Sequence, residues 1–468
     1  MKLVVAKFGG SAIGPDGLSI PIIIQRISDL KKDSKVVCVF SAPLTIKDGK
    51  TRSITDIILD LGQKAESGQT VNLDIIKDTY QKITQLVGTQ YQNECKKVID
   101  EFLNKAQKSL DAAKEKREFA NEIRSNALAF SGEILMSYVM DFILKAKGIK
   151  SSSVPFDSWP IITDKNIEST NFLYSESIKR IDTLEKLVEQ NDIVTIGGFI
   201  GKTTEGITTT YERGGSDRTA ADLGILLCKK YDSRIDFEKD SAVVSADPKI
   251  VSKDLSAVEE LSYNEARLAG MFGMKILDPI AIKEIVENGV DIPIIISNMK
   301  DPKQTTTIKR NPNRHEGNPL KIVTGKKNCA IFRTESEAAG RLLTSLEKDK
   351  RYSEFVILSP FTKDGIEFTR ILFLDSDYLQ RNEKYFLGFD SLAAITYNRG
   401  VITVIGDEMW RVQQIASKTS SKLGEAGLNI LNMDAQEETS RIIIVIEDSD
   451  NNIPEAIRAI HSQRSKFV

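Results

Sequence analysis

Short apolar runs recur through the first 300 residues of this chain, and most are flanked by Gly, Ser or Pro. They are rich in Val and Ile, as is typical of strands that are buried on both faces of a sheet. Longer stretches with helical spacing lie between them, as from Val98 to Ala113, where apolar residues recur every three or four positions. This alternation predicts an α/β domain with a mainly parallel sheet. The predicted strands are 3–8, 35–40, 193–196, 242–245 and 292–296.

The pattern changes at 301–320, a stretch rich in Pro, Asn and charged residues that predicts a linker between domains. Residues 396–468 then follow the order strand, helix, strand, strand, helix, and 321–395 carry a looser version of it. Two such βαββα units in tandem form a divergent internal repeat. We therefore expect a first domain over 1–300, followed by a linker and two small α/β units.

Composition excludes several classes of protein. The 468 residues are enough for two or three domains, and the net charge of −2 does not indicate a nucleic-acid partner. We expect no membrane partner, because no apolar stretch approaches the roughly 20 residues that a membrane helix needs. Four scattered cysteines without a C-x-x-C motif predict reduced thiols in the cytoplasm. With two histidines, neither a zinc site nor a His-based triad is expected, and no metal site is predicted.

The segment T-T-T-Y-E-R-G-G-S-D at 208–217 lies between a predicted strand and a helix of small residues. Its two glycines let the backbone approach a ligand, and amides at a helix N-terminus favour an anion. Arg213 adds a bidentate donor, and Asp217 adds a carboxylate that can hold an ammonium group. The turn therefore indicates a site for an amino acid or a phosphate donor. Taken alone, it is equally typical of a Gly-rich turn with a surface ion pair.

The chain also opens with a strand that ends in K-F-G-G-S at 7–11. A lysine followed by glycines can grip phosphates, because the ammonium neutralises charge while loop amides bind the oxygens. Residues 197–203 look similar to a P-loop, but that pattern requires glycine where the chain has Ile196. No G-x-G-x-x-G occurs either, so a Rossmann dinucleotide site is not predicted.

Taken in order, these motifs resemble those of the aspartate kinases, in the amino acid kinase superfamily, over essentially the whole chain. The further motifs that carry the resemblance are S-A at 41–42, S-I-T-D at 53–56, S-G-E at 131–133, S-A-D-P-K at 245–249 and F-G-M-K-I-L-D-P at 272–279. The resemblance implies a three-layer α/β/α catalytic domain of the amino-acid-kinase type over 1–300. It also implies that 321–395 and 396–468 are ACT-like units of ferredoxin-like topology.

The activity that the resemblance implies is ATP-dependent phosphorylation of the β-carboxylate of L-aspartate to 4-phospho-L-aspartate, the first step toward lysine, threonine and methionine. A carboxylate nucleophile is already ionised at neutral pH, so catalysis needs alignment and charge neutralisation, with Mg²⁺ bridging phosphate oxygens. Two alternatives remain open. One is a kinase of the same superfamily that acts on another amino acid, and the other is a non-catalytic amino-acid sensor.

The resemblance also assigns residues to the site. The implied catalytic residues are Lys7, Arg213 and Asp217. The implied aspartate-binding residues are Ser41, Thr55, Glu133, Arg213, Ser216 and Asp217. The implied ATP-binding residues are Lys7, Gly9, Gly10, Ser11, Ser241, Lys249 and Lys275. Thr45 remains an alternative to Thr55, and structural roles remain open for Glu133 as a first-turn acid, for Lys249 as a turn cap and for Lys275 as a solvated side chain.

The sequence departs from the family at 238–242, where E-K-D-S-A replaces the usual T-D-V-D-G of the nucleotide site. This change leaves the nucleotide preference open. The ACT-like units imply feedback by lysine or threonine, although the loop at 333–337 lacks the usual glycine and does not indicate which effector binds. Family analogy implies a homodimer or a larger homo-oligomer. We expect no fused homoserine dehydrogenase beyond the ACT-like region.

Overall fold

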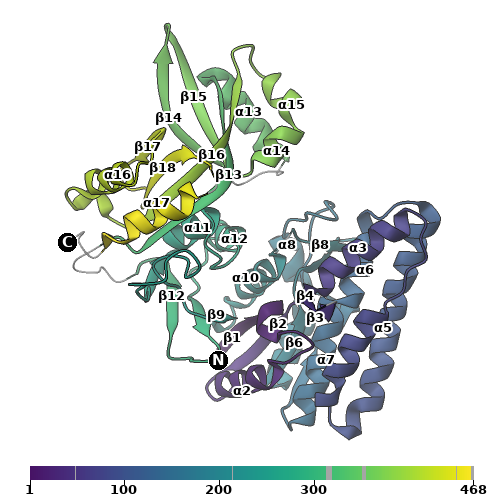
Figure 1. Ribbon diagram of the computed structural model, residues 1–468. Coiled ribbons are helices and arrows are strands. Elements are labelled where there is room, and N and C mark those ends of the chain that lie inside the picture. Colours follow the sequence, from purple (N-terminus) through teal and green to yellow (C-terminus); the bar gives the residue numbers. More distant parts are fainter. Residues whose placement is uncertain (48, 213, 313–318, 350–354, 450, 465–468) are drawn as a thin grey trace. The chain divides into compact units, whose positions relative to one another are not determined.

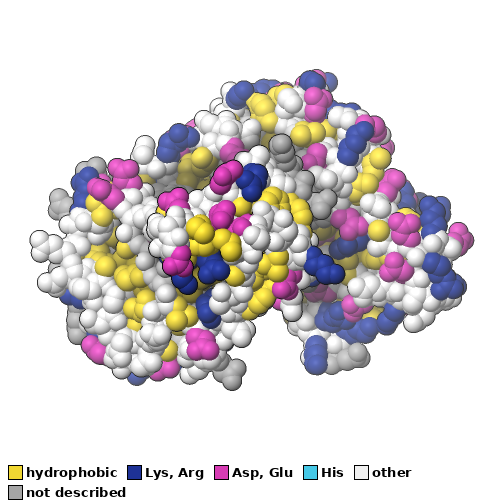
Figure 2. Space-filling view, turned by 90° about the horizontal axis from the view of Figure 1, so that it is seen from above, with side chains coloured by type: hydrophobic (Ala, Val, Ile, Leu, Met, Phe, Trp, Pro, Cys, Tyr) yellow, Lys and Arg dark blue, Asp and Glu magenta, His cyan; other side chains and the backbone are white. Residues whose placement is uncertain are grey.

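The computed structural model describes residues 1–468 apart from 48, 213, 313–318, 350–354, 450 and 465–468 (Figure 1). The described chain forms two compact units. The first unit comprises Met1–Ala242 with Ile280–Arg310, and the second comprises Val243–Pro279 with Asn311–Val468. Figure 2 shows basic and acidic side chains scattered over the face in view, with hydrophobic side chains between them.

This division differs from the expected single boundary at 301–320, because residues 243–279 belong to the second unit and not to the first. The Val323 amide donates a hydrogen bond to the carbonyl oxygen of Ser245. Ala246 and Val251 are buried in the same apolar core as Ile402. The segment therefore contributes its apolar side chains to the second unit, which the polar composition of 301–320 could not reveal.

The first unit contains a sheet with the strand order β12-β11-β9-β1-β2-β6-β5. Its neighbours pair in parallel except for β11 and β12, which are antiparallel. This confirms the predicted mainly parallel sheet. The strands are β1 (Lys2–Phe8), β2 (Lys35–Phe40), β5 (Ser151–Ser153), β6 (Ile193–Gly197), β9 (Asp232–Lys239), β11 (Ile294–Asn298) and β12 (Thr305–Lys309).

The sequence pattern placed a strand at 242–245, whereas the structure has strand β9 earlier in the chain, at Asp232–Lys239. Three charged residues, Arg234, Asp236 and Glu238, alternate in it with Ile235 and with the residues that follow. Charged side chains at every second position make this segment look polar in the sequence, although the centre of the strand is buried. The prediction for β11 is closer, since that strand begins two residues later than 292–296.

Helices cover both faces of the sheet, as the α/β/α prediction requires. From α2 (Ile20–Leu30), Arg26 reaches Glu238 of β9. From α10 (Gly215–Leu227), Gly224 lies so close to Ile235 of β9 that an added Cβ would be 2.7 Å from its Cδ1. Because residues 235 and 238 of a strand point to opposite faces, α2 and α10 lie on opposite sides of the sheet.

Long helices gather beside the sheet, and Figure 1 shows α3, α5, α6 and α7 standing side by side. The predicted amphipathic helix is confirmed in α5, whose buried residues include Phe102 and Leu110. The helices and remaining strands of this unit are α1 (Gly10–Ile13), β3 (Leu44–Lys47), β4 (Lys50–Ser53), α3 (Ile54–Glu66), α4 (Asp74–Ile83), α5 (Thr89–Lys116), α6 (Asn121–Ser131), α7 (Glu133–Ala146), α8 (Tyr174–Ser177), α9 (Asp182–Gln190), β7 (Ile200–Lys202), β8 (Thr208–Thr210) and α12 (Pro279–Glu287).

Asn121–Ala146 has the length and apolar character of a membrane span, so the prediction that no stretch does is wrong here. These 26 residues pass that test by composition, but 83% of the apolar window is buried inside the protein. They comprise α6 and α7, which meet at Gly132. Their apolar character is that of core helices, which are surrounded by other helices and by the sheet.

The second unit contains an antiparallel sheet with the order β14-β15-β13-β16-β18-β17. Each half follows the predicted βαββα order, and β13 pairs with β16 to join the halves. Its elements are β10 (Glu260–Ser262), α11 (Tyr263–Met271), β13 (Ile322–Glu335), α13 (Ser336–Asp349), β14 (Phe355–Lys363), β15 (Ile366–Phe373), α14 (Ser376–Arg381), α15 (Glu383–Leu387), β16 (Ala394–Ile405), α16 (Ile415–Glu425), β17 (Asn432–Ala435), β18 (Arg441–Glu447) and α17 (Asn452–His461). In the second half, a separate 3-10 turn, Met409–Arg411, precedes α16.

Candidate active site

An ion pair joins the end of β1 to the first turn of α10. The Lys7 Nζ lies 2.6 Å from the Asp217 Oδ1, and only 13% and 11% of the two side chains are exposed. Gly214 caps α10 with a φ of 91°, a left-handed conformation that favours glycine. Asp217 is also favoured by the positive end of the helix dipole. Charges of both signs are thus held at one edge of the sheet, as the sequence motifs predicted for Lys7 and Asp217.

The two glycines after β1 bring the backbone close to this ion pair. A Cβ at Gly9 would lie 3.2 Å from the Lys7 Nζ, so the ammonium group lies against the loop. A Cβ at Gly10 would lie 2.9 Å from the carbonyl oxygen of Ala42. Glycine at position 10 therefore permits a close approach between this loop and the loop at 41–42, which contains Ser41. Ser11 follows in α1 and is exposed.

Another pair of glycines, at the end of β6, brings two helix N-termini to the same edge. A Cβ at Gly198 would lie 2.6 Å from the Cβ of Ser216, at the start of α10. A Cβ at Gly197 would lie 2.7 Å from the carbonyl carbon of Glu133, at the start of α7. The predicted site residues Glu133, Ser216 and Asp217 are thus brought together around the carboxyl ends of the central strands.

Glu133 is a buried carboxyl group, with 5% of the residue exposed. Burial raises its pKa to about 7, although hydrogen bonds from the backbone amides of Glu133 and Ala42 oppose the shift. The Tyr80 hydroxyl donates to the carbonyl oxygens of Ser131 and Gly132, which fixes the turn that precedes α7. A cation that binds beside this carboxyl group, such as an ammonium group, would lower its pKa and favour the ionised form.

Thr45 and Thr55 have different surroundings. Thr45 is buried, and its hydroxyl donates to Asp16 and accepts from Thr79, at 3.2 Å and 2.8 Å. Thr55 is half-buried in the first turn of α3, where the Ser53 side chain accepts a hydrogen bond from the Asp56 amide at 3.0 Å. The hydroxyl of Thr45 therefore already serves the fold.

Three of the remaining predicted residues lie outside the first unit or outside the described residues. Arg213 lies outside the described residues. Lys249 and Lys275 are exposed and belong to the second unit, whereas Ser241 is exposed just beyond β9 in the first unit. Their predicted roles toward aspartate and ATP stay predictions.

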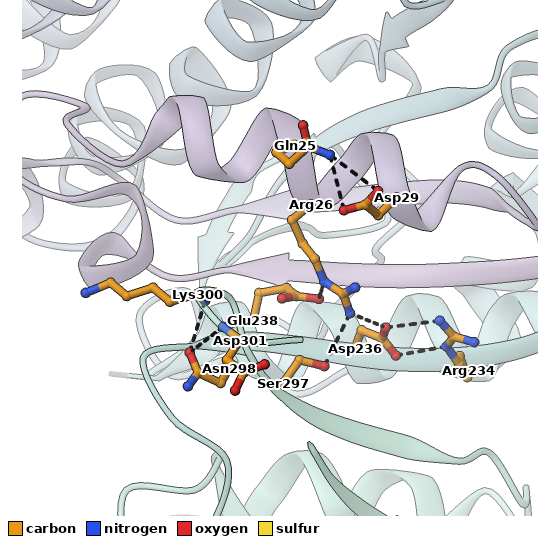
Figure 3. Close-up of polar contacts among 10 residues, drawn as sticks. All are labelled: Gln25, Arg26, Asp29, Arg234, Asp236, Glu238, Ser297, Asn298, Lys300 and Asp301. Atoms are coloured by element: carbon orange, nitrogen blue, oxygen red, sulfur yellow. Dashed lines mark hydrogen bonds and ion pairs between the residues drawn. The ribbon is translucent and has the colours of Figure 1, made fainter. Parts of the chain in front are cut away.

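Sequence reasoning missed a cluster of buried charges on the α2 side of the sheet (Figure 3). The Arg26 Nε lies 2.8 Å from the Glu238 Oε1, and Arg26 also approaches Asp236 at 3.6 Å. The Arg234 Nε lies 3.0 Å from the Asp236 Oδ1. Burial raises the pKa of Glu238 to about 7, an effect that Arg26 opposes. The charged residues at every second position of β9 were the sequence signal that could have revealed this cluster.

Sequence reasoning also missed Lys239, the last residue of β9. Burial lowers the pKa of its ammonium group, Asp217 acts to raise that pKa, and Lys7 acts to lower it. Lys239 therefore lies within electrostatic range of both members of the ion pair.

The family model described as "Amino acid kinase family" matches residues 2–298, which include all of β1, α10 and β9. The chain belongs to the amino acid kinase family. The matched span includes Lys7, Glu133 and Asp217, so the edge of the sheet described above is part of the family's own domain.

Known proteins similar to this family member are aspartokinases. The chain is 25% identical over 484 residues to the bifunctional aspartokinase/homoserine dehydrogenase of Buchnera aphidicola, aligning with 99% of this chain and 56% of that protein. It is 26% identical over 324 residues to the lysine-sensitive aspartokinase 3 of Escherichia coli, covering 68% of this chain and 66% of the relative. The chain thus spans only about half the length of the bifunctional relatives that it matches.

A solved structure extends the likeness to both units. The structure of E. coli aspartokinase III in complex with aspartate and ADP matches 98% of this chain and 99% of its own, with a TM-score of 0.77 at 18% identity. The comparisons confirm the resemblance to aspartate kinases and the predicted fold class.

Proposed function

We propose that this protein is an aspartate kinase that transfers the γ-phosphoryl group of ATP to the β-carboxylate of L-aspartate. The observation that carries the proposal is the buried Lys7–Asp217 ion pair at the carboxyl ends of the strands, beside Ser216 and the buried carboxyl group of Glu133. Cationic and anionic groups at one edge suit a substrate that is an amino acid and a co-substrate that is a polyphosphate.

The reaction needs no general base at neutral pH. A β-carboxylate oxygen attacks the γ-phosphorus, the bond from that phosphorus to the bridging oxygen breaks, and its electron pair leaves with ADP. Lys7 neutralises charge on the moving phosphoryl group, and Gly9, Gly10 and Ser11 would line its path. Bound to ATP as part of that co-substrate, Mg²⁺ would supply further neutralisation of the phosphate charge.

Aspartate would be held by groups that match its charges. Glu133 and Asp217 would face its ammonium group, and Ser41, Thr55 and Ser216 would donate hydrogen bonds to its carboxylates. Thr55 is favoured over Thr45 because the hydroxyl of Thr45 already bonds to Asp16 and Thr79. The proposal keeps Arg213 for the α-carboxylate, and keeps Ser241, Lys249 and Lys275 for the nucleotide.

We assign regulation to the second unit, with ACT-like units over 321–395 and 396–468 and the catalytic domain over 1–300. A cavity of about 450 Å³ lies in the second ACT-like unit, beside Trp410, Gln414 and Glu437. A lysine-sensitive relative supports lysine as the effector, and threonine is the second candidate. The protein would work in the cytoplasm as a homodimer or larger homo-oligomer, at the start of lysine, threonine and methionine biosynthesis.

The choice of substrate is tested by measuring ADP release with L-aspartate, L-glutamate and N-acetyl-L-glutamate, each with ATP and Mg²⁺. We expect L-aspartate to give a kcat/KM at least about a hundred times that of the other acids, because misplaced carboxylates lose alignment with the γ-phosphorus. Preference for another acid would replace aspartate within the same family. ADP release with none of them by a folded protein would favour the amino-acid sensor.

A further inference from the structure

We infer that Lys239 is a second cation of the phosphoryl-transfer site, and that it binds phosphate oxygens of the nucleoside triphosphate together with Lys7. The inference rests on the proposed function for the identity of the reaction. It assigns a role to a residue of this chain where the family pattern at 238–242 has an aspartate.

The register of two parallel strands places both lysines on one face of the sheet. Lys7 of β1 is paired with Phe237 of β9, and Phe8 is paired with Glu238. Paired residues of neighbouring strands share a face, and so do residues two apart in one strand. Lys239 therefore projects from the same face as Lys7, one step further toward the carboxyl edge of the sheet.

The opposite face of β9 gives an independent check. Figure 3 shows that Asp236 and Glu238 point toward Arg26, which comes from α2. Because Lys239 follows Glu238 directly, its side chain turns to the other face, which α10 covers. That helix begins with the turn that holds Asp217, the partner of Lys7.

The charges of these groups act on one another. Asp217 attracts Lys239, whereas Lys7 repels it, and burial further disfavours the ammonium form of Lys239. A polyphosphate bound between the two lysines would replace this repulsion with two attractions. The arrangement therefore favours an anionic ligand with several oxygens, of the kind that ATP presents at this edge.

The chemistry gives the second cation a specific task. As the bond to the γ-phosphorus breaks, negative charge grows on the β-phosphate oxygens of the leaving ADP. Lys7 and Lys239 together can neutralise the moving phosphoryl group and the leaving group. Since no proton is transferred, each lysine stays charged through the step.

The test compares Lys239→Met, which removes the charge, with Lys239→Arg, which keeps it. Lys230→Met is the matched control, because Lys230 lies before the start of β9, and that strand runs about 23 Å from Asp232 to Lys239. Calorimetry without aspartate measures the Kd of ADP and of the non-hydrolysable analogue AMP-PNP, each with Mg²⁺. Thermal unfolding of each variant reports its folded fraction.

We expect Lys239→Met to weaken AMP-PNP binding at least about tenfold, and more than ADP binding, because AMP-PNP carries the additional phosphate. Lys239→Arg should stay within about threefold of the wild type, and Lys230→Met within about twofold. Wild-type affinity for AMP-PNP should fall at alkaline pH as Lys239 loses its proton, whereas Lys239→Arg should keep its affinity.

Unchanged AMP-PNP binding in folded Lys239→Met would overturn the inference. So would a loss that matches the decrease in folded protein, because a structural lysine would give that result. Since binding is measured without aspartate, a weakened Lys239→Met supports the second cation even if L-aspartate proves not to be the substrate.

Discussion

The two faces of strand β9 use charge in opposite ways. On the α2 face, Arg26 and Arg234 meet Asp236 and Glu238 within the protein, and these groups hold a helix to the sheet (Figure 3). On the α10 face, Lys7 and Asp217 pair at the edge of the sheet, where 13% and 11% of their side chains are exposed. Alternation along one strand can therefore separate charges that stabilise the fold from charges to which we assign a role in catalysis.

Asp217→Asn should produce the largest change and should affect activity rather than folding. The substitution removes the carboxylate that faces Lys7 and the proposed substrate ammonium group, so we expect kcat/KM for aspartate to fall about 10²- to 10³-fold. Steady-state kinetics measure this fall, and urea unfolding measures stability. A variant that keeps its turnover would place Asp217 with the structural charges.

Arg26→Met should have the reverse effect, on stability rather than activity. It leaves Glu238 and Asp236 buried with less positive charge beside them, and breaking a buried ion pair costs roughly 3–5 kcal/mol. Urea unfolding would show this loss, while kcat per folded molecule should stay within about threefold of the wild type. A large loss of kcat in folded protein would break the distinction between the two faces.

Glu133 should make aspartate binding depend on pH. Its pKa is raised to about 7, so the neutral form dominates below pH 7 and the ionised form above it. Because the substrate ammonium group requires the ionised form, the affinity for aspartate should rise about tenfold from pH 6 to pH 8. Isothermal titration of wild type and Glu133→Gln tests this, and the variant should bind weakly with a flat profile. An equal slope in the variant would assign the pH dependence to another group.

Arg234→Met should have the smallest effect on stability. It compares two arginines of the α2 face that differ in burial. Arg234 pairs with the same carboxylate as Arg26, but 44% of its side chain is exposed, against 12% for Arg26. An exposed ion pair contributes roughly 0–1 kcal/mol, so urea unfolding should detect little change. A loss as large as that of Arg26→Met would show that burial is not what separates the two arginines.

Much of the fold could be predicted because many of its strands are short β-branched runs flanked by Gly, Ser or Pro. Strand β9 escaped prediction for a physical reason, since Arg234, Asp236 and Glu238 mark a strand as polar unless their partners are known. Arg26 is more than 200 residues away in the chain, so local pattern could not supply that partner. For the same reason, the local pattern could not show that 243–279 belongs to the second unit, where its apolar side chains pack into the core.

The candidate site was predictable where glycines and charges fall together. K-F-G-G at 7–10 and G-G-S-D at 214–217 do meet at one edge of the sheet. Lys239 escaped prediction because it occupies a position where the family motif has an aspartate, so comparison with that motif does not indicate a lysine there. Only the strand register shows that its lysine shares a face with Lys7.

The central claim is that the α10 face performs phosphoryl transfer to a carboxylate, and trapping the acyl phosphate tests it most directly. Wild type and Lys7→Ala would be incubated with L-aspartate, ATP, Mg²⁺ and hydroxylamine, and the hydroxamate measured. We predict aspartyl hydroxamate from the wild type and a loss of at least about 10²-fold in folded Lys7→Ala. No hydroxamate from folded wild type with either L-aspartate or L-glutamate, or equal formation by Lys7→Ala, would contradict the claim.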